Sequence, residues 1–365
     1  MPSAEVIVVG GGIAGLSATW HLARAGIRVV LLERERLLAS HASARNAAIF
    51  RHIERAPSHV ALALRSATLF SELGLDAEPV QRIGALYVGA PTVLAEVAEA
   101  AARGSVPCSA VSGGELGALA PGLSGSGMAA LHVPSDGVMD VHGVLDRLAR
   151  SARACGARLC VDTEVQQVLT EGRRVTGVRL ANGETLRTDT VVLAAGAWAA
   201  GLGEACGAPL PLVPHRRHLV MLAVDASFAR GPIVWRLDPH HQVYFRPESG
   251  GVLASPCDEE AWPAGAPPAD LDMVAQLGAR LSPLAPAIAR GAVRRAWACL
   301  RTLTPDGELA VGEDPRCDGL FWLAGLGGRG MTCGLALGEL AAACVRGVPH
   351  PLARALAPAR WVHHA

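Results

Sequence analysis

Short aliphatic runs near the N-terminus alternate with a helical pattern of apolar residues. Residues 6–9 read Val-Ile-Val-Val, and residues 27–32 read Ile-Arg-Val-Val-Leu-Leu. Runs of this length, rich in β-branched residues, are typical of strands buried in a parallel sheet. Between them, residues 13–23 carry apolar side chains at helical spacing, and Gly26 ends that stretch. The pattern predicts a strand–helix–strand unit at the start of the chain.

A different pattern occupies the middle of the chain. Residues 213–222 and 242–246 predict strands, and the Pro-Glu-Ser-Gly-Gly sequence at 247–251 predicts a hairpin turn after the second of them. A Pro- and Gly-rich stretch at 262–268 separates this sheet from an amphipathic segment near 271–281. The middle of the chain is therefore expected to form an antiparallel sheet.

Composition narrows the class of protein. The 365 residues suffice for about two domains. The 33 basic and 33 acidic residues give a formal charge of zero, so no nucleic-acid partner is expected. Every basic residue is arginine, which excludes Schiff-base and P-loop lysine chemistry. Nine cysteines without a C-x-x-C pair favour a reduced, cytoplasmic chain and predict no metal site.

Membrane attachment and export signals are also not predicted. The N-terminus has no basic region of the kind that begins a signal peptide. No apolar run reaches the ~18–20 residues that a transmembrane helix needs. A peripheral position at the inner face of a membrane is the alternative to a cytoplasmic one, and a homo-oligomer is an open alternative to a monomer.

The turn after the first strand fits G-x-G-x-x-G at Gly10, Gly12 and Gly15. In this motif Gly10 allows the tight turn, Gly12 lets a pyrophosphate approach the backbone, and Gly15 lets helix and strand pack closely. Glu33 follows Gly15 by 18 residues, at the end of the second strand, where an acid accepts hydrogen bonds from ribose hydroxyls. The acid disfavours a 2′-phosphate, so the motif predicts a Rossmann-like domain for FAD or NAD.

Three other segments favour FAD over NAD. Small residues at 42–48 would let the backbone pass close to a flat ring, and residues 188–198 read as a strand that enters a small-residue turn. Residues 320–334 form a strand and a glycine-rich loop before a helical stretch at 335–346. Such a helix could direct its positive N-terminus at a ring carbonyl of a reduced flavin. A nicotinamide dehydrogenase needs no cofactor loops at both ends of its chain.

In their order and spacing these segments resemble the D-amino acid oxidase-like family of FAD-dependent amine oxidoreductases, over nearly the whole chain. Within the family, the sequence is most similar to the D-arginine and D-amino acid dehydrogenases, and it also resembles glycine oxidase and sarcosine oxidase. The resemblance is carried by residues 6–35, 43–48, 137–159, 191–199, 243–256, 297–313 and 319–332.

The resemblance implies an α/β fold (α+β overall). A Rossmann-like FAD-binding domain of the glutathione-reductase type, at 1–80, 140–205 and 300–365, would be interleaved with an antiparallel-sheet substrate domain at 81–139 and 206–299. The cofactor-binding residues expected from the motifs and the resemblance are Gly10, Gly12, Ile13, Ala14, Gly15, Glu33, Arg34, Ser43, Arg45, Asn46, Ala47, Ala48, Val165, Ala195, Gly196, Trp198, Gly328, Arg329, Gly330, Met331 and Thr332.

The family's reaction transfers a hydride from the substrate α-carbon to flavin N5 and leaves an imine that water hydrolyses. Such chemistry needs a carboxylate clamp and a slot for the side chain more than it needs acids and bases. Arginine suits the clamp because its planar fork binds a carboxylate bidentately. The resemblance assigns this task to Arg301 and Arg217, with Arg216 expected on the opposite face of the strand.

Two further residues are candidates for the same site. Tyr244 matches an active-site tyrosine of the dehydrogenases, with a packed sheet tyrosine as the alternative, whereas Tyr87 is expected to be sheet packing. Arg51 resembles the carboxylate arginine of sarcosine oxidase and would serve as a clamp residue or as a contact at its flank. His52 is a weaker candidate beside it.

Departures from the family pattern bear on the substrate and on the cofactor. Gly84 stands where the D-arginine enzyme has an acid for the guanidinium, and Ile49 stands where it has a histidine. A neutral substrate side chain is therefore favoured. Cys299 occupies the place of the cysteine that binds FAD covalently in sarcosine oxidase, but the better-matched dehydrogenases have no such bond. Noncovalent FAD is thus expected, with a link through Cys299 as the alternative.

The favoured function is oxidative deamination of a D-amino acid, or of a glycine-type or N-methyl amino acid. A dehydrogenase that passes electrons to a quinone or another carrier is favoured over an oxidase using O2. Sarcosine oxidase uses a lysine near the flavin for O2 and this chain has none, although an arginine or His218 could substitute. The alternatives are a 2-hydroxy-acid dehydrogenase and a flavin-binding accessory protein without turnover.

Overall fold

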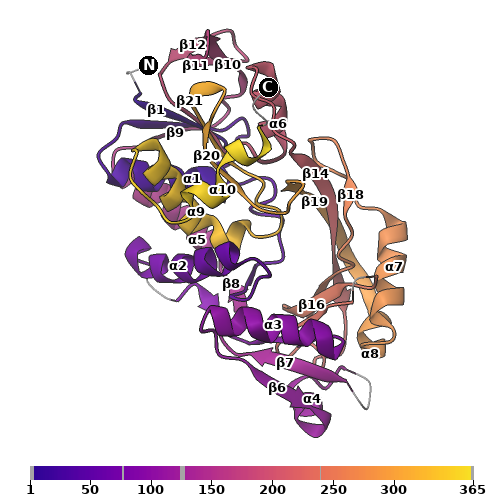
Figure 1. The fold of residues 1–365 in the computed structure, drawn as a ribbon. Helices are drawn as coiled ribbons and strands as arrows, with labels where there is room; N and C mark the ends of the chain where they lie inside the picture. The colour runs from indigo at the N-terminus through magenta and orange to yellow at the C-terminus, as the bar shows by residue number, and fades with distance from the viewer. Residues whose placement is uncertain (1–3, 76–77, 124–127, 239, 363–365) are drawn as a thin grey trace.

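Two nine-stranded sheets and one three-stranded sheet organise the chain in the computed structural model (Figure 1). The structure describes residues 4–75, 78–123, 128–238 and 240–362. The chain passes from one large sheet to the other and back, so that segments far apart in sequence contribute to each sheet. The cavity described below is lined by residues from both.

The first sheet contains the predicted strand–helix–strand unit at its parallel centre. Its strands β1 (Val6–Val9) and β2 (Val29–Leu32) are buried at every position, as expected for parallel strands that are covered on both faces. The order across the sheet is β10 (Val165–Glu171), β11 (Arg174–Leu180), β21 (Cys317–Ala324), β13 (Val191–Leu193), β1, β2 and β9 (Arg158–Cys160), with β12 (Thr185–Arg187) beside β11 and β20 (Ala310–Asp314) beside β21.

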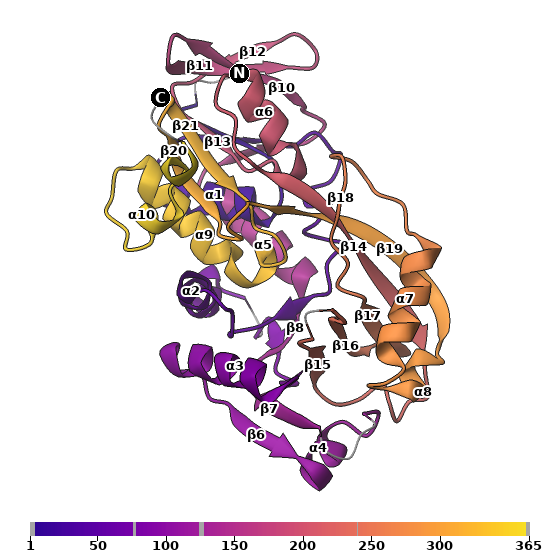
Figure 2. The same cartoon turned by 45° about the vertical axis from the view of Figure 1, so that its right-hand side comes forward.

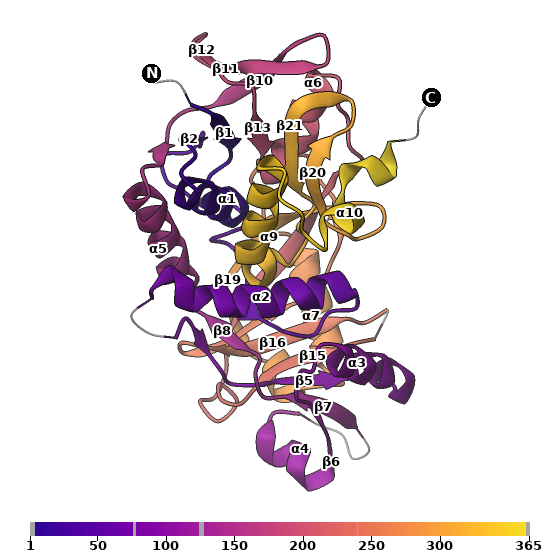
Figure 3. The same cartoon turned by 60° about the vertical axis from the view of Figure 1, so that its left-hand side comes forward.

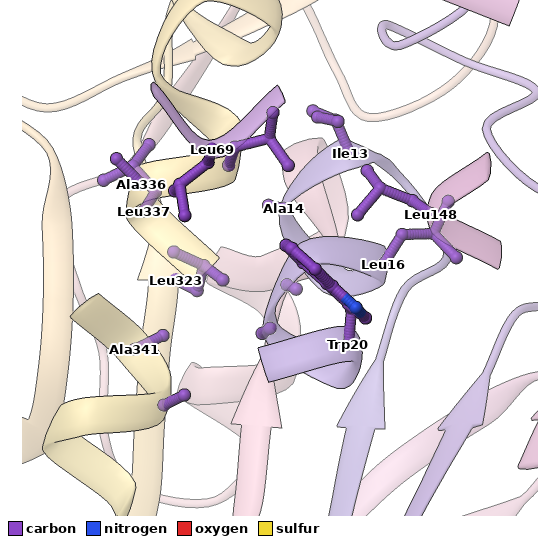
Figure 4. Close-up of a cluster of buried hydrophobic side chains, with 14 of the residues drawn as sticks. Ile13, Ala14, Leu16, Trp20, Leu69, Leu148, Leu323, Ala336, Leu337 and Ala341 are labelled. Carbon is purple, nitrogen blue, oxygen red and sulfur yellow. The ribbon is translucent and has the colours of Figure 1, made fainter. Parts of the chain in front are cut away.

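Helices α1 (Ile13–Arg24), α5 (Val141–Ala154) and α9 (Gly330–Val345) lie side by side against this sheet, and α2 (Pro57–Leu73) packs across α9 (Figure 3). Their apolar faces form one buried cluster with the sheet (Figure 4). Among its members are Ile13, Leu16, Trp20, Leu69, Leu148, Leu323, Ala336, Leu337 and Ala341.

The α1–α9 contact is close enough to involve the backbone. The Ser17 hydroxyl donates a hydrogen bond to the Leu335 carbonyl at 3.0 Å. A Cβ on Gly338 would overlap Ser17, so only glycine permits this approach. The contact fixes the two helices relative to one another, and the first residues of both line the same cavity.

The second large sheet is antiparallel except where β15 pairs with β5. Its two longest strands pair from Val213 opposite Leu303 to Ala223 opposite Ala292, and Figure 2 shows them running toward α7. The order is β18 (Glu260–Ala261), β14 (Val213–Ala223), β17 (Gly251–Ser255), β16 (Val243–Glu248), β15 (Ile233–Arg236), β5 (Ala85–Val88), β7 (Ala129–Val133) and β6 (Ser109–Ser112), with β19 (Ala292–Leu303) on β14.

A small sheet of β3 (Ile49–Phe50), β8 (Gly137–Met139) and β4 (Val80–Gln81) completes the strands of the described residues.

β19 keeps its pairing in the second sheet through Leu303, past the expected start of an FAD-domain segment at 300. The domain boundaries stay a prediction. The remaining helices are α3 (Pro91–Arg103), α4 (Gly113–Leu119), η1 (Gly196–Trp198), α6 (Ala199–Ala205), α7 (Leu271–Leu281), α8 (Pro286–Ala289), α10 (Ala353–Leu356) and η2 (Pro358–Trp361).

Within the described ranges, no helix is both long enough and apolar enough to cross a bilayer.

Candidate active site

A cavity of about 1150 Å³ is lined by residues from both large sheets. It brings together all four expected substrate-binding residues, Arg51, Arg217, Tyr244 and Arg301. It is also lined by every expected cofactor-binding residue except Gly15 and Ala48. Two groups of residues that are distant in sequence thus share one space.

The glycine turn after β1 forms one wall of the cavity. Gly10 has a φ of +107°, and a Cβ there would overlap the Ala194 carbonyl. Gly15 does not line the cavity, because it packs against the Gly10 carbonyl from inside α1. Helix α1 therefore starts immediately beside the strand end, with its N-terminus at the cavity.

The acid at the end of β2 lies beside this turn. One Glu33 carboxylate oxygen accepts a hydrogen bond from the Gly11 amide at 2.7 Å, and the other accepts from the Glu35 amide at 2.8 Å. Ser43 accepts a hydrogen bond from the Ile13 amide at 3.0 Å. A carboxylate oxygen accepts more than one donor, so Glu33 keeps the capacity to bind ribose hydroxyls.

Three hydrogen bonds, one within the loop and two from the second sheet, hold the loop of small residues at 42–48 in place. Within the loop, the Asn46 side-chain oxygen accepts from the Ala48 amide at 2.6 Å, and Ala48 has a positive φ of 55°. From the second sheet, the Arg246 Nε donates to the Ala47 carbonyl at 2.6 Å, and the Trp297 Nε1 donates to the Arg45 carbonyl at 3.1 Å. The second large sheet thus positions the loop at 42–48 directly.

Stacked side chains form another part of the lining. The Arg34 guanidinium lies 3.8 Å from the ring centroid of Trp198, and the His41 ring lies 4.7 Å from that centroid. Glu35 accepts from His41 at 2.8 Å and from Arg34 at 3.1 Å. These hydrogen bonds, the one from His41 first, lower the pKa of Glu35. Val165, Ala195 and Gly196 line the cavity near by.

The start of α9 faces the cavity through residues 328–332. Its N-cap residue, Arg329, makes no side-chain capping bond, so the first amides of α9 stay available to a ligand. With the start of α1, two positive helix ends meet this space, one beside a glycine turn and an acid. Those features fit the pyrophosphate, the ribose and the anionic ring of FAD.

Arg217 and Arg301 lie on neighbouring strands, β14 and β19, and both line the cavity. Arg217 is buried, its Nε has no hydrogen-bond partner in the described part of the chain, and its Nη2 pairs with Glu259. Burial and the nearby Arg301 guanidinium both lower the pKa of Arg217. Two like charges are therefore held close together with little counter-charge.

Arg301, unlike Arg217, makes no ion pair with a carboxylate in the described part of the chain. No carboxylate is among its main electrostatic neighbours in the described residues. A Cβ on Gly328 would lie 2.8 Å from its Nη1, so the guanidinium sits against the loop before α9. An anion that bound both arginines would neutralise Arg301 and would add to the neutralisation of Arg217 by Glu259.

Tyr244 lies at the same end of the cavity. It is fully buried, and its hydroxyl has no hydrogen-bond partner among the residues described. Its ring centroid is 4.3 Å from that of Trp235. Burial raises the pKa of Tyr244, so the phenol stays protonated and can donate to an oxygen of a ligand.

The neighbouring residue of β14 points away from the cavity. Arg216 stacks on Trp262 at 4.1 Å and pairs with Glu260 at 2.5 Å and Asp270 at 3.1 Å. Consecutive residues of a strand face opposite sides, which accounts for the different surroundings of Arg216 and Arg217.

Arg51 also lines the cavity, but unlike Arg301 it is paired with a buried carboxylate. Its guanidinium pairs with Glu54 at 2.6 Å and lies 4.8 Å from the Trp235 ring centroid. Glu54 is buried and also pairs with Arg329 at 3.2 Å. Burial alone would raise the pKa of Glu54, but these two guanidiniums hold it below its ordinary value. Arg51 is thus already neutralised, unlike Arg301.

Two histidines considered from the sequence do not line the cavity. His52 pairs with the buried Asp136 at 3.0 Å, and Asp136 also accepts from the Tyr87 hydroxyl at 2.8 Å. His218 is fully buried between Asp258 at 2.7 Å and the Asp270 amide at 2.9 Å. His218 therefore does not reach the cavity, where it would have to lie in order to replace the lysine of sarcosine oxidase.

Cys299 and Ile49 line the cavity, whereas Gly84 does not. Burial raises the pKa of Cys299, which disfavours the thiolate. Among the lining residues that were not expected from the sequence are Glu54, Trp235 and Glu259. Trp235 sits in an ordinary strand pattern, and the two acids sit among other charges, so no local signal marks them. No metal-ligating group of three or more His, Cys, Asp or Glu occurs where the chain is described.

A family model described as "FAD dependent oxidoreductase", the DAO family, matches residues 5–344. The chain belongs to this family. It is 32% identical over 343 residues to glycine oxidase of Pseudomonas aeruginosa, with 88% of each chain covered. It is 28% identical to 4-methylaminobutanoate oxidase (formaldehyde-forming) of Paenarthrobacter nicotinovorans, covering 94% of this chain but only 44% of that protein.

The fold comparison agrees with the family assignment. The solved structure of L-proline dehydrogenase from P. horikoshii superimposes with a TM-score of 0.88 at 23% identity, covering 98% of each chain. The predicted fold, a Rossmann-like FAD-binding sheet with an antiparallel substrate sheet, is confirmed for this FAD-dependent oxidoreductase. A position nearest the D-arginine dehydrogenases stays a prediction.

Proposed function

We propose that this DAO-family protein oxidises a D-amino acid, or a glycine-type or N-methyl amino acid, at its α-carbon. The product is an imine that water hydrolyses to a 2-oxo acid. One observation carries the proposal: the guanidiniums of Arg301 and Arg217 and the hydroxyl of Tyr244 line one end of the cavity with unused hydrogen-bonding capacity.

A substrate carboxylate suits this end of the cavity for electrostatic reasons. The two arginines repel one another, and a shared carboxylate would replace that repulsion by two charge-assisted contacts. The buried Nε of Arg217 and the Tyr244 hydroxyl lack partners, and leaving buried donors unpaired is costly. A carboxylate has enough lone pairs for these donors. Binding the acid here would orient the α-carbon in the cavity.

The cofactor end completes the proposed site. The turn at Gly10 and Gly12, the start of α1 and Glu33 would hold the dinucleotide, and the start of α9 would face the ring. When bound, FAD supplies the acceptor for the hydride that leaves the α-carbon. The protein holds the acid, excludes water around it and fixes its direction of approach.

An amine is favoured over a 2-hydroxy acid because no histidine lines the clamp end of the cavity among the described residues. Alcohol oxidation requires a group that takes the hydroxyl proton. In the described part of the chain, the one histidine of the lining is His41, which packs against Trp198 at a tilt and is hydrogen-bonded to Glu35 at the cofactor end. An amine can instead lose its proton to water before oxidation. Two proteins similar to this chain, glycine oxidase and 4-methylaminobutanoate oxidase (formaldehyde-forming), are named for substrates that carry an amine and a carboxylate.

We further propose a dehydrogenase with noncovalent FAD. The chain contains no lysine that could stabilise a forming superoxide, so a quinone or another carrier is the favoured electron acceptor. The raised pKa of Cys299 keeps its thiol protonated, whereas attachment to the flavin requires the thiolate.

One series of measurements on the purified flavoprotein tests these proposals. D- and L-amino acids, glycine, N-methyl amino acids and 2-hydroxy acids are added without oxygen, and the visible flavin absorbance is followed. A D-, glycine-type or N-methyl amino acid should bleach the flavin. Air is then admitted to the reduced sample, which should regain its colour slowly, and acid precipitation should release the yellow cofactor.

Each readout can contradict one part of the proposal. Bleaching by 2-hydroxy acids alone would replace amine oxidation by alcohol oxidation. A flavin that no compound reduces would support a role without turnover. Rapid recovery of colour in air would identify an oxidase, and yellow precipitate would identify a covalent bond.

A further inference from the structure

Part of the cavity lining lies outside the carboxylate clamp and is formed by apolar side chains. This part, which we call the side-chain branch, consists of Ile53, Val97, Ala100, Trp235 and Leu237. Val97 and Ala100 belong to α3, Trp235 and Leu237 belong to β15 and the residue after it, and Ile53 follows β3. Four of the five are aliphatic. Trp235 adds an aromatic ring and one polar atom, a buried Nε1 that has no hydrogen-bond partner among the described residues.

Trp235 connects the side-chain branch to the clamp. Its ring packs on Tyr244 with 4.3 Å between centroids. It also belongs to the apolar cluster of Ile53 and Ala100, against which Val97 and Leu237 pack. A molecule whose carboxylate lay beside Tyr244 would therefore have an apolar path past Trp235 toward α3.

Charges around the branch are already paired. At its outer end Arg55 pairs with Glu96 at 3.2 Å, and Arg103 lies 3.9 Å from Glu99. Next to Trp235, the Arg51 guanidinium is neutralised by Glu54. The branch thus offers no unmatched charge among the described residues to a cationic or anionic side chain, and burying such a group there would carry a desolvation penalty.

We infer that the side-chain branch receives the side chain of the substrate, and that the preferred substrate is an amino acid with an extended apolar or aromatic side chain. This inference rests on the proposed function and narrows its substrate class. Burying one methylene group favours binding by about fourfold. Glycine and short amino acids would leave the branch unfilled, and arginine-like ones would bury a charge without a partner.

A homologous series of substrates tests the inference in the wild-type flavoprotein. Alanine, 2-aminobutyrate, norvaline and norleucine, all of the enantiomer that reduces the flavin, differ by single methylene groups. We expect kcat/KM, measured with an artificial electron acceptor, to rise by about fourfold per step. The same measurement with lysine should give a value at least tenfold below that of norleucine.

Variants on α3 locate the effect. Val97→Phe narrows the branch, and we expect it to lower the norleucine-to-alanine ratio of kcat/KM at least tenfold. Leu237→Phe narrows the branch from the opposite wall and guards against misfolding of the first variant. Ala95→Phe is the matched control, because Ala95 is exposed on the same helix and does not line the cavity. It should keep the wild-type ratio.

The outcomes separate this inference from the proposed function. A flat series in the wild type, or preference for lysine over norleucine, would overturn the inference while amine oxidation stands. An equal loss for alanine and norleucine in both narrowed variants would identify the branch as an entrance and would also overturn it. Failure of all amino acids to reduce the flavin would instead remove the proposed function itself.

Discussion

The two ends of the cavity are built from different parts of the polypeptide. At the cofactor end the important groups are backbone amides and close backbone contacts, at the Gly10 turn and at the starts of α1 and α9. At the clamp end they are the long side chains of Arg217, Tyr244 and Arg301, carried by β14, β16 and β19. The first end depends on conformation, and the second depends on charge.

This difference predicts how each end fails. A backbone site tolerates no added atom where two segments touch, so a small substitution should remove the cofactor. A side-chain site tolerates substitution of its residues without loss of fold but loses affinity for the acid that they bind. The following variants are chosen to affect one end and leave the other intact.

Gly10→Ala should have the largest effect. At a φ of +107° an alanine is strained by about 1–3 kcal/mol, and its Cβ would also overlap the Ala194 carbonyl. The turn must move, and with it the start of α1. We expect affinity for FAD to fall at least about 100-fold, measured as the flavin absorbance per chain after purification and by titration with FAD.

Gly26→Ala is the control that introduces backbone strain without a steric clash of the new Cβ. Gly26 also has a positive φ, of 84°, but a Cβ there meets nothing within 4 Å. The strain alone costs about 1–2 kcal/mol, so the melting temperature should fall by a few degrees while the FAD content stays at the wild-type level. Full FAD binding by Gly10→Ala would contradict the account of the turn.

Arg217→Gln should have the next largest effect, at the other end. Losing one charged contact to a carboxylate costs about 2–4 kcal/mol, or roughly 30- to 1,000-fold in kcat/KM. FAD content should not change. Arg216→Gln, one residue away and facing Trp262, should stay within about threefold of the wild type. Equal losses in the two variants would indicate a role for this strand in stability only.

The contrast also explains how much the sequence could predict. The glycine turn, the acid at Glu33 and the helix that follows form one contiguous motif, because a phosphate-binding backbone is made by neighbouring residues. At the clamp, strand alternation placed Arg216 and Arg217 on opposite faces without deciding which of them points inward. The resemblance to the family supplied Arg217, Arg301 and Tyr244. The fold class followed from these patterns, and the expected site residues line the cavity, except for Gly15 and Ala48.

The electrostatic state of each arginine could not be predicted in the same way. From the sequence, Arg51, Arg217 and Arg301 are all candidates for binding the substrate carboxylate. Only the folded chain shows that Glu54 neutralises Arg51. The partner of Arg217 is Glu259, 42 residues away, and which of two adjacent acids reaches it depends on how β18 meets β14. Trp235, which joins the clamp to the side-chain branch, likewise has no mark in its strand pattern.

Glu259→Gln should have the smallest effect, and it should strengthen ligand binding where the other variants weaken it. The Glu259 carboxylate, about half exposed, occupies a donor of Arg217 that a substrate carboxylate would need. Exposed ion pairs are worth about 0.2–1 kcal/mol, so removing this competitor should tighten carboxylate binding by up to about fivefold. The dissociation constant of benzoate, which cannot be oxidised, can be measured from the change that it causes in the flavin spectrum.

Glu260→Gln provides the matched control for this last variant. Glu260 pairs with Arg216 on the opposite face of the strand, so its loss should leave benzoate binding unchanged. Weaker binding in Glu259→Gln would mean that Glu259 orients Arg217 for the ligand instead of competing with it. Tighter binding would show that Glu259 partly neutralises Arg217 until a carboxylate ligand displaces it. Arg217 would then be intermediate between Arg51, which is fully paired, and Arg301, which has no carboxylate partner.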